Sequence, residues 1–261
     1  MKKVGIALGG GGAKGLAHIA FLKVLDEKGI RPSVISGTSM GAIIGAMYAS
    51  GMSAVQIENT FSSMTLRQYS GLIDISIFRK KGVIKGDKIL SKIREIVGCR
   101  DFKDLEIPLK IVATDLTKRK QVIMDKGDVC KAVRASISIP GVFEPVIQNN
   151  HVIIDGSFSN LVPYDIIRKE CDILIAVDIL MEDKKKDSGN VPHLVDTLIS
   201  SFYMLHRAKE EKKSSSLKPE IYIKLSMDNI GFMEFHKTKK ALADAEKEAK
   251  KFSKKIEKKL G

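Results

Sequence analysis

The feature that most constrains this chain is the stretch 33–45, Ser-Val-Ile-Ser-Gly-Thr-Ser-Met-Gly-Ala-Ile-Ile-Gly. A β-branched run leads into it and small, helix-forming residues continue to Ala49, so the pattern Gly-x-Ser-x-Gly is expected at a tight turn from a strand into a helix. Such a turn needs neighbours without bulk, which Gly37 and Gly41 supply. It would hold the Ser39 hydroxyl beside a helix N-terminus that can stabilise a developing anion. We therefore predict that Ser39 is a nucleophile; the alternative is a structural turn that matches the pattern by chance.

A second glycine-rich turn comes earlier in the chain. An apolar strand expected at 3–8 is followed by Gly-Gly-Gly-Gly-Ala-Lys-Gly at 9–15 and then by an amphipathic helix that stops at Gly29. Backbone N–H groups in a turn of this kind point at whatever lies above the helix N-terminus. Three kinds of site compete for it: a dinucleotide site, a P-loop and an oxyanion hole.

The residues favour the oxyanion hole. Gly10, Gly12 and Gly15 fit the dinucleotide fingerprint, but that fingerprint also requires an acidic residue at the end of the second strand, where this chain has Ser-Gly-Thr-Ser. The P-loop pattern fails because Lys14 is followed by Gly15 and not by Ser or Thr. A nucleophilic serine at the tip of the second strand needs N–H donors nearby, and the tip of the first strand is its neighbour in a parallel sheet.

The base that would activate the serine is predicted from the carboxylates that end strands. Asp155 closes an apolar strand and precedes Gly156, so it can be held rigidly at a sheet edge. A carboxylate bonded to the serine hydroxyl can act as base without an imidazole, because partial desolvation raises its pKa. Asp115, which ends another strand, is the second choice. The histidines are assigned to packing, helices or the surface: His18, His151, His193, His206 and His236.

Alternating strand and helix signals along the chain predict a doubly wound α/β domain. We expect one domain over 1–261, with a motif-bearing core over about 3–180 and a C-terminal helical extension over about 190–261. Residues 52–85 are apolar but irregular, which suits either a lid or acyl-chain channel or ordinary helical core. The polar run 181–190 is expected to be a loop and the best candidate for disorder.

Composition and charge narrow the setting of the protein. No apolar run reaches the ~18 residues of a membrane-spanning helix, and the glycines at 9–12 interrupt the apolar core of a signal peptide. Three cysteines without a C-x-x-C pair suit a reducing cytoplasm and give no template for a metal.

Of the net charge of +13, a net +6 lies in 237–261, where ten lysines stand against four acidic residues. The lysine-rich face of this closing helix is expected to be solvated, with contact to an anionic membrane as a second role. We expect a cytoplasmic protein, peripheral to the inner membrane face where it makes that contact, and no nucleic-acid partner. The sequence is silent on the oligomeric state.

Four motifs, in this order, resemble those of the patatin-like phospholipases, particularly the short bacterial members. The motifs are the seven residues at 9–15, Gly-Thr-Ser-Met-Gly at 37–41, Arg-Ala-Ser-Ile-Ser-Ile-Pro-Gly-Val-Phe-Glu-Pro at 134–145, and Asp-Gly-Ser at 155–157. The resemblance covers about residues 3–180, and four ordered motifs form a specific signal. It implies a three-layer α/β/α fold, in which a mostly parallel central sheet carries helices on both faces.

The same resemblance implies a function and a set of roles. The family hydrolyses acyl esters of lipids with a Ser–Asp dyad, so a phospholipase A, lysophospholipase or esterase-like activity is expected, with a lipid or acyl-ester substrate and no metal or organic cofactor. The implied roles are nucleophile for Ser39, base for Asp155 and oxyanion donors for the N–H groups of Gly10, Gly11 and Gly12.

One departure from the family pattern is Ser157, because the family usually has glycine or alanine there; it bears on the fine geometry of the loop. Two other classes of function stay open. A non-catalytic regulator or adaptor that retains a hydrolase fold would bind a protein partner through 181–261. A nucleotide-binding protein would use 9–15 as a phosphate cradle.

Overall fold

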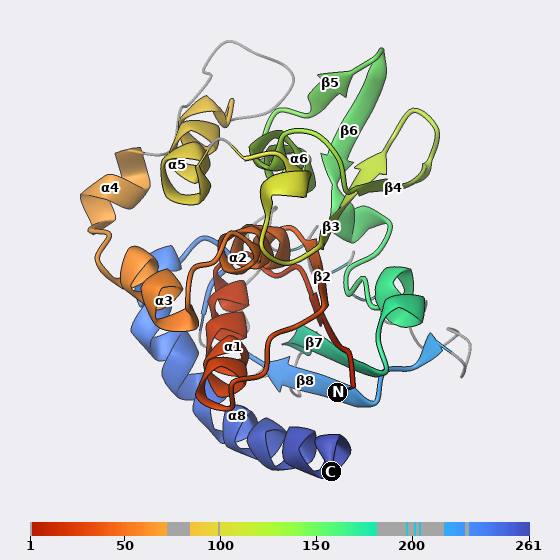
Figure 1. The fold of residues 1–261 in the computed structure, drawn as a ribbon. Coiled ribbons are helices and arrows are strands. Elements are labelled where there is room, and N and C mark those ends of the chain that lie inside the picture. The colour runs from red at the N-terminus through yellow and green to blue at the C-terminus, as the bar shows by residue number, and fades with distance from the viewer. Residues whose placement is uncertain are drawn as a thin grey trace.

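The computed structural model describes residues 2–71, 84–98, 100–181, 197, 201, 204, 217–227 and 230–261. Among these residues a single sheet runs through the molecule in the strand order β5-β6-β3-β2-β1-β7-β8, and β4 pairs with β3 (Figure 1). The strands are β1 (Val4–Leu8), β2 (Val34–Thr38), β3 (Leu109–Asp115), β4 (Lys120–Met124), β5 (Val146–Gln148), β6 (His151–Asp155), β7 (Ile173–Met181) and β8 (Ile221–Ser226).

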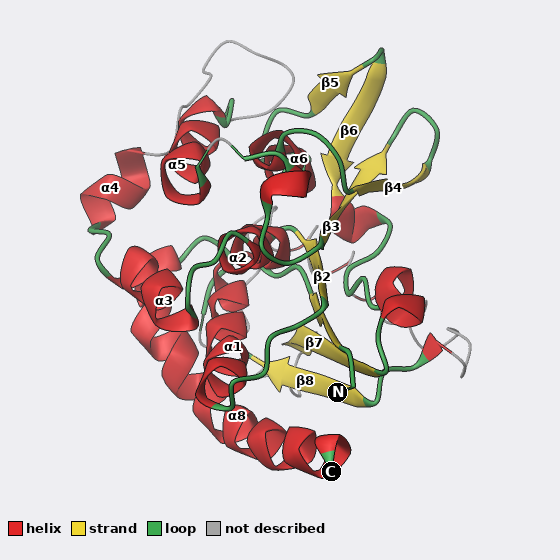
Figure 2. Cartoon of the chain, in the orientation of Figure 1, coloured by secondary structure: helices red, strands yellow, loops and turns green. Residues whose placement is uncertain are grey.

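Helices connect and cover these strands (Figure 2). The α-helices are α1 (His18–Glu27), α2 (Met40–Ala49), α3 (Ala54–Ser62), α4 (Leu66–Gly71), α5 (Asp87–Val97), α6 (Val129–Ser136) and α8 (Thr238–Leu260). The short 3₁₀-helices are η1 (Gly12–Ala17), η2 (Phe102–Asp104), η3 (Gly156–Phe158), η4 (Asp165–Glu170) and η6 (Phe235–Lys237).

The middle of the sheet is parallel and buried on both faces. β1 pairs with β2 and β7, β2 with β3, and β7 with β8, all in parallel. Every residue of β1 and β2 is buried, as expected of strands covered from both sides. Ile6 and Leu8 belong to the core formed with α1, α2 and α8, whereas Ala7 belongs to a second core formed with the segment around η4. The predicted three-layer α/β/α fold is confirmed.

The other end of the sheet is antiparallel, and it brings two strand ends together. Thr38, the last residue of β2, pairs with Val112 of β3. Asp155, the last residue of β6, pairs with the next residue of β3, Ala113. Because β4 occupies the opposite side of β3, β2 and β6 run toward one another along the same side, and their C-terminal ends meet.

The predicted C-terminal extension is built into the sheet and its covering layer. β8 lies beside β7, and α8 runs along α1 (Figure 1). The rings of Phe21 and Phe252 meet edge to face between α1 and α8, with their centroids 5.9 Å apart. On the closing helix, Ala245, Ala249, Phe252 and Ile256 are buried, whereas Leu260 is exposed. Residues 182–196, which include most of the predicted polar loop, lie outside the described residues.

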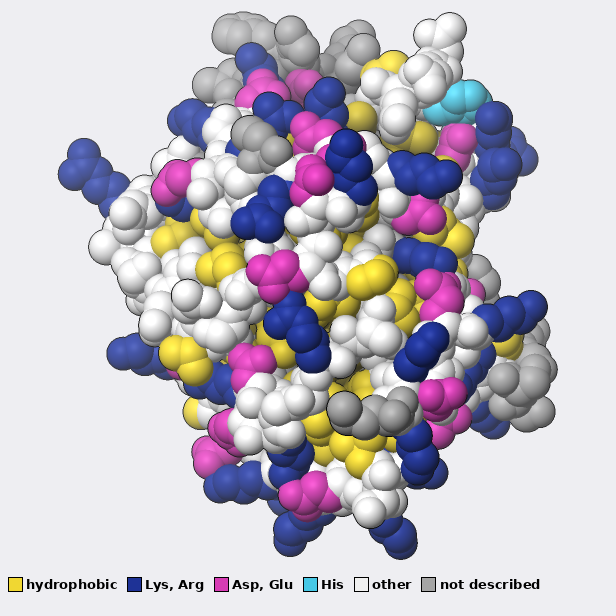
Figure 3. Space-filling model, viewed as in Figure 1, with side chains coloured by type: hydrophobic (Ala, Val, Ile, Leu, Met, Phe, Trp, Pro, Cys, Tyr) yellow, Lys and Arg dark blue, Asp and Glu magenta, His cyan; other side chains and the backbone are white. Residues whose placement is uncertain are grey.

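Charged side chains are mixed on the surface. On the face drawn in Figure 3, Lys and Arg are interspersed with Asp and Glu. On α8, Lys250 pairs with Glu246 at 2.7 Å and Lys251 with Glu248 at 2.6 Å, which agrees with a solvated face; contact with an anionic membrane stays a prediction. None of the helices that the structure describes combines the length and the apolar composition of a membrane span.

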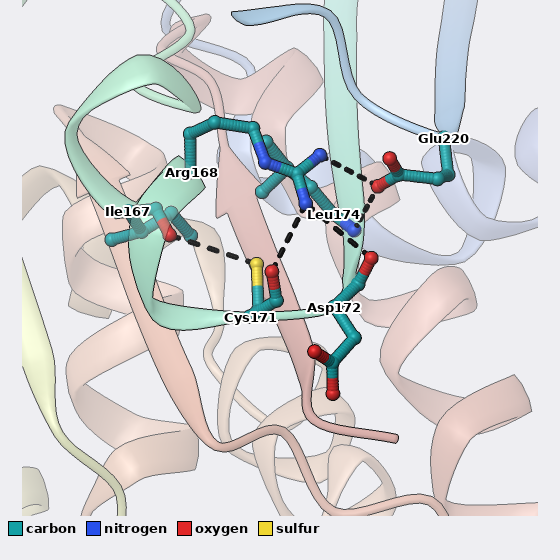
Figure 4. Close-up of polar contacts among 6 residues, drawn as sticks. All are labelled: Ile167, Arg168, Cys171, Asp172, Leu174 and Glu220. Carbon is teal, nitrogen blue, oxygen red and sulfur yellow. Dashed lines mark hydrogen bonds and ion pairs between the residues drawn. The ribbon is translucent and has the colours of Figure 1, made fainter.

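A network of hydrogen bonds links the residue before β8 to the start of β7, away from the C-terminal ends of β2 and β6 (Figure 4). Arg168 of η4 donates to the Glu220 carboxylate at 2.7 Å and to the Cys171 carbonyl at 3.0 Å. The same Glu220 oxygen accepts from the N–H of Leu174 at 2.7 Å. Charge-assisted hydrogen bonds of this kind are stronger than neutral ones. This network therefore fixes the position at which β8 joins the sheet beside β7.

Candidate active site

Ser39 occupies a strained turn between β2 and α2. Its backbone has φ 54° and ψ −119°, a left-handed φ that is costly for a residue other than glycine and persists only where its surroundings enforce it. The neighbours do enforce it. A β-carbon on Gly37 would lie 2.5 Å from the Gly41 carbonyl oxygen, and one on Gly41 would collide with the Leu8 carbonyl. Gly37 is therefore needed for α2 to start this close to β2, and Gly41 for α2 to approach β1 this closely.

Asp155 lies at the same place, because β6 ends where β2 ends. Its side chain is fully buried, and burial raises the pKa of the carboxyl group to about 6. The Ser157 N–H and the nearby Ser157 and Ser39 hydroxyls act in the opposite direction and lower that pKa. The Ser157 N–H donates to Oδ1 of Asp155 at 2.8 Å.

The second carboxylate oxygen of Asp155 differs from the first in its contacts. Oδ2 is buried and has no partner within ordinary hydrogen-bond geometry among the described residues. The Ser39 hydroxyl is nevertheless close enough to the carboxylate to lower its pKa. An unpartnered buried acceptor is costly in a folded protein, and here it is adjacent to the strained serine.

Two serines of the 134–145 motif hold Ser39 and Asp155 in place, a role that the sequence did not reveal. Ser136 Oγ accepts from the Ser39 N–H at 2.9 Å and donates to the Val112 carbonyl at 2.6 Å. The Ser138 carbonyl accepts from the Asp155 N–H at 2.9 Å. The same motif therefore braces both members of the predicted dyad, through the Ser136 side chain and the Ser138 main chain.

Arg134 organises the rest of that motif. Its guanidinium is almost fully buried and donates to Ser138 Oγ at 2.6 Å, to the Glu144 carbonyl at 2.9 Å and to the Lys85 carbonyl. It also lies over the ring of Phe143, 5.7 Å from the centroid. Arg134 thereby fixes the path of the segment that follows α6.

The glycine-rich turn passes directly over Ser39. A β-carbon on Gly10 would lie 3.4 Å from Cβ of Ser39 and 2.5 Å from Oγ of Ser157. The N–H of Gly10 donates to the Leu161 carbonyl at 3.0 Å, so this N–H group already has an acceptor in the conformation seen here. The N–H groups of Gly11 and Gly12 make no such bond within the described residues.

His18 anchors this turn from beneath. It is fully buried at the start of α1, and its Nε2 lies 2.8 Å from the Gly9 carbonyl. Because a carbonyl can only accept, Nε2 carries the proton. Burial lowers the pKa of the imidazole to about 4, so His18 is neutral at pH 7. His18 is packed in the interior, which is one of the settings expected for the histidines. It also holds the backbone of the glycine-rich turn.

An apolar cavity of about 300 Å³ opens at Ser39. One wall comes from α2, and another from α5 and the segment after α6. Phe61, Met64, Leu66 and Tyr69 from the described part of 52–85 also line it, so these residues fit the channel alternative. Residues 72–83 lie outside the described part of the chain.

Asp115, the second-choice base, is not placed at Ser39. It lies three residues beyond Val112 on β3, where Oδ2 is 3.0 Å from Nδ1 of His151 and Oδ1 accepts from the Lys118 N–H at 2.9 Å. Among the other histidines, His236 is exposed at the cavity. His193 and His206 lie outside the described residues.

Comparison with known proteins gives the same reading of the fold. The family model for patatin-like phospholipase matches residues 6–167. An uncharacterised NTE family protein of Mycobacterium tuberculosis is 38% identical over 178 residues, which are 68% of this chain and 49% of that protein. Patatin-like phospholipase domain-containing protein 6 of Homo sapiens is 30% identical over 187 residues, 69% of this chain and 14% of that protein.

The chain thus spans about half the length, or less, of these curated relatives. Among solved structures, VipD from Legionella pneumophila aligns with a TM-score of 0.52 at 15% identity. The alignment covers 97% of this chain and 67% of VipD. At this identity the likeness concerns the fold alone.

Proposed function

This chain belongs to the patatin-like phospholipase family, and we propose that it hydrolyses acyl esters of lipids with Ser39 as nucleophile and Asp155 as base. The observation that carries the proposal is the placement of a fully buried carboxylate, with one unpartnered oxygen, beside a serine on a strained turn. An apolar cavity opens at that serine. A nucleophile, a base and a place for an acyl chain therefore adjoin one another.

In the first step, Ser39 Oγ attacks the ester carbonyl carbon while Oδ2 of Asp155 takes the hydroxyl proton. The negative charge of the carboxylate passes to the former carbonyl oxygen, which becomes the oxyanion of a tetrahedral intermediate. The N–H groups of Gly11 and Gly12 are the donors left to stabilise that oxyanion. In a comparable hydrolase, the loss of one such donor costs about 3–4 kcal/mol of transition-state stabilisation.

In the following steps the proton on Asp155 passes to the departing alcohol oxygen as the ester C–O bond breaks, which leaves an acyl group on Ser39. Water then attacks that acyl group and gives its proton to Asp155. The tetrahedral intermediate collapses, the fatty acid leaves, and the proton returns to Ser39 Oγ. One ester and one water become one acid and one alcohol, and the enzyme is restored.

The cavity supports a lipid-derived acyl chain as the group bound. Its lining is almost entirely aliphatic, aromatic or methionine side chains, which suits a hydrocarbon chain and not a sugar or a nucleotide. Leu66 and Met233 line it and are 63% and 41% exposed, so apolar side chains continue from the cavity to the surface. Whether the chain belongs to a phospholipid, a lysophospholipid or a neutral lipid is decided by the experiment below.

Kinetics on medium-chain nitrophenyl esters test the proposal. Ser39→Ala and Asp155→Asn are expected to lower kcat roughly a thousandfold or more. Asp115→Asn is the matched control, because it removes a buried carboxylate that ends a strand but does not adjoin Ser39; it should retain wild-type turnover. If both dyad variants retain wild-type turnover, the dyad is wrong. Hydrolysis products from total bacterial lipid then identify the ester class.

The same variants separate the two other functions. An adaptor would support normal cellular function in a Ser39→Ala strain, and a nucleotide-binding protein would show NAD or ATP binding by calorimetry. The structure favours neither over hydrolysis, because the glycine-rich turn faces an apolar cavity through Gly12.

A further inference from the structure

A short segment near the C-terminus, 230–237, reaches the candidate active site although it lies outside the matched family region 6–167. It consists of the turn that precedes η6 and of η6 itself. Four of its side chains line the cavity that opens at Ser39, namely Phe232, Met233, Phe235 and His236. The family motifs therefore build the reacting groups, and a different part of the chain completes the cavity.

Phe232 lies against the glycine-rich turn. Its carbonyl accepts from the N–H of Ala13 at 2.8 Å. A β-carbon on Gly12 would lie 2.5 Å from that carbonyl oxygen and 2.6 Å from two carbons of the Phe232 ring. Only glycine at 12 leaves room for the ring, so Phe232 bounds the cavity beside the glycine-rich turn.

Phe235 makes the second attachment, to the helices that follow the nucleophile. Its ring stacks on Tyr69 of α4, with centroids 6.2 Å apart and planes 23° from parallel. The Tyr69 hydroxyl in turn donates to the Phe61 carbonyl at 2.6 Å. The segment thus spans from the glycine-rich turn to α4 and closes this side of the cavity.

The segment is held in one conformation by its own polar groups. The Glu234 carboxylate accepts from the Gly231 N–H at 2.7 Å and from Lys237 Nζ at 2.6 Å. Ile230, at its start, is almost fully buried in the main core. Side chains on a braced turn keep a defined position, which a wall that selects among ligands requires.

We propose that segment 230–237 is the specificity-determining wall of the cavity, and that Phe232 and Phe235 set the length and bulk of the acyl chain that fits beside Ser39. The inference rests on the proposed function, since it assigns the cavity to an acyl chain. A cavity of about 300 Å³ lies at the small end of ligand sites. Loss of one ring from its wall is therefore a large relative change in the room available.

Fatty-acid binding tests this without depending on turnover. Octanoate, laurate and palmitate are titrated against a fluorescent fatty-acid probe bound to the Ser39→Ala protein, alone and combined with Phe232→Ala or Phe235→Ala. The affinity ratio of palmitate to octanoate is expected to rise about tenfold or more in the wall variants. Phe252→Leu is the matched control, because Phe252 is a buried aromatic of α8 that does not line the cavity; its ratio should equal that of the parent.

Phe232→Leu and Phe235→Leu answer the same question where circular dichroism shows an alanine variant to be unfolded. An unchanged ratio in the folded wall variants overturns the proposal, as does a parent protein that binds none of the three acids. Ester hydrolysis by the Ser39-containing protein is scored separately. A shifted affinity ratio without hydrolysis supports the role of segment 230–237 and contradicts the proposed function. Hydrolysis with an unshifted affinity ratio supports the proposed function and contradicts the role of the segment.

Discussion

Ser39 and Asp155 are brought together by strand register: Thr38, which precedes the serine, pairs with Val112 of β3, and Asp155 pairs with the next residue, Ala113. The spacing between the two groups is therefore fixed by the hydrogen-bonded ladder of the sheet and not by a flexible loop. A slip of β6 by one residue would turn the Asp155 side chain to the opposite face. The geometry of the proposed dyad is thus a direct consequence of how a parallel partner, β2, and an antiparallel partner, β6, share one side of β3.

The activity is expected to depend on the ionisation of Asp155. Burial raises the pKa of this carboxyl group to about 6, and it must be ionised to accept the Ser39 proton. The pH profile of kcat/KM on a soluble short-chain ester should therefore rise through about pH 6 and level off above it. A profile that stays flat from about pH 4 to about pH 8 would show that another group acts as base.

Ser157 is expected to tune that profile. Its N–H donates to the Asp155 carboxylate, and its hydroxyl lies close enough to lower the pKa of that carboxyl group as well. Ser157→Ala removes only the hydroxyl, so the pKa of Asp155 should rise and the acid limb should move to higher pH, while the plateau is kept. Ser159→Ala is the control, because its hydroxyl lies 2.8 Å from Thr114 Oγ1. Acid limbs with the same pH midpoint in the two variants would contradict a role for the Ser157 hydroxyl.

His18 and Asp155 are expected to make opposite contributions to the pH dependence of stability. The folded-state pKa of Asp155 is raised from 3.8 to about 6, so its contribution to the free energy of unfolding falls as pH rises through that window. The pKa of His18 is lowered from 6.5 to about 4, so its contribution falls as pH drops through nearly the same window. Each shift corresponds to about 3 kcal/mol, and the two largely cancel in the wild type.

Single substitutions should uncover each contribution. In Asp155→Asn only the contribution of His18 to the free energy of unfolding remains. This variant should therefore be more stable than wild type near pH 7 and should lose stability steeply between about pH 6.5 and about pH 4. His18→Gln should show the reverse slope. Chemical denaturation across this pH range measures both, and parallel curves for the two variants would contradict the linkage.

Close backbone packing at the nucleophile predicts a severe effect for one small substitution. Gly41→Ala would drive a methyl group into the Leu8 carbonyl, so the protein is expected to be insoluble or destabilised by several kcal/mol. Gly71→Ala is the matched control, because no atom of the described residues lies within 4 Å of a β-carbon there. In α4 it should be neutral or stabilise by about 0.5–1 kcal/mol. Thermal unfolding of the two variants gives the comparison, and a stable, active Gly41→Ala protein would contradict the packing described here.

The motifs predicted the fold and the positions of Ser39 and Asp155, because both residues sit at strand ends that local patterns identify. Their meeting depends on the antiparallel return of β6 along β3, which no local pattern specifies. The hydrogen bond of the Gly10 N–H could not be predicted either, since its acceptor, the Leu161 carbonyl, comes from a segment about 150 residues away. The place of Phe232 in the cavity could not be predicted for the same reason, because its partner Gly12 lies at the other end of the chain.

His18 and the insert show a different limit of sequence patterns. An amphipathic pattern places His18 on a buried helix but does not show that its imidazole holds the Gly9 carbonyl. The irregular apolar run 52–85 suits a lid, a channel or plain core equally well. The described part of it lines the cavity because α3 packs against α2 and both α3 and α4 contact η6, and that packing depends on long-range contacts.

Covalent trapping with an alkyl fluorophosphonate, followed by intact mass and peptide mapping, tests the central claim most directly, because this reagent bonds to an activated serine. One adduct on Ser39 is expected in the wild type and in Asp115→Asn, with labelling slowed at least about a hundredfold in Asp155→Asn and abolished in Ser39→Ala. An adduct on another serine, or equal labelling rates in wild type and Asp155→Asn, would contradict the account.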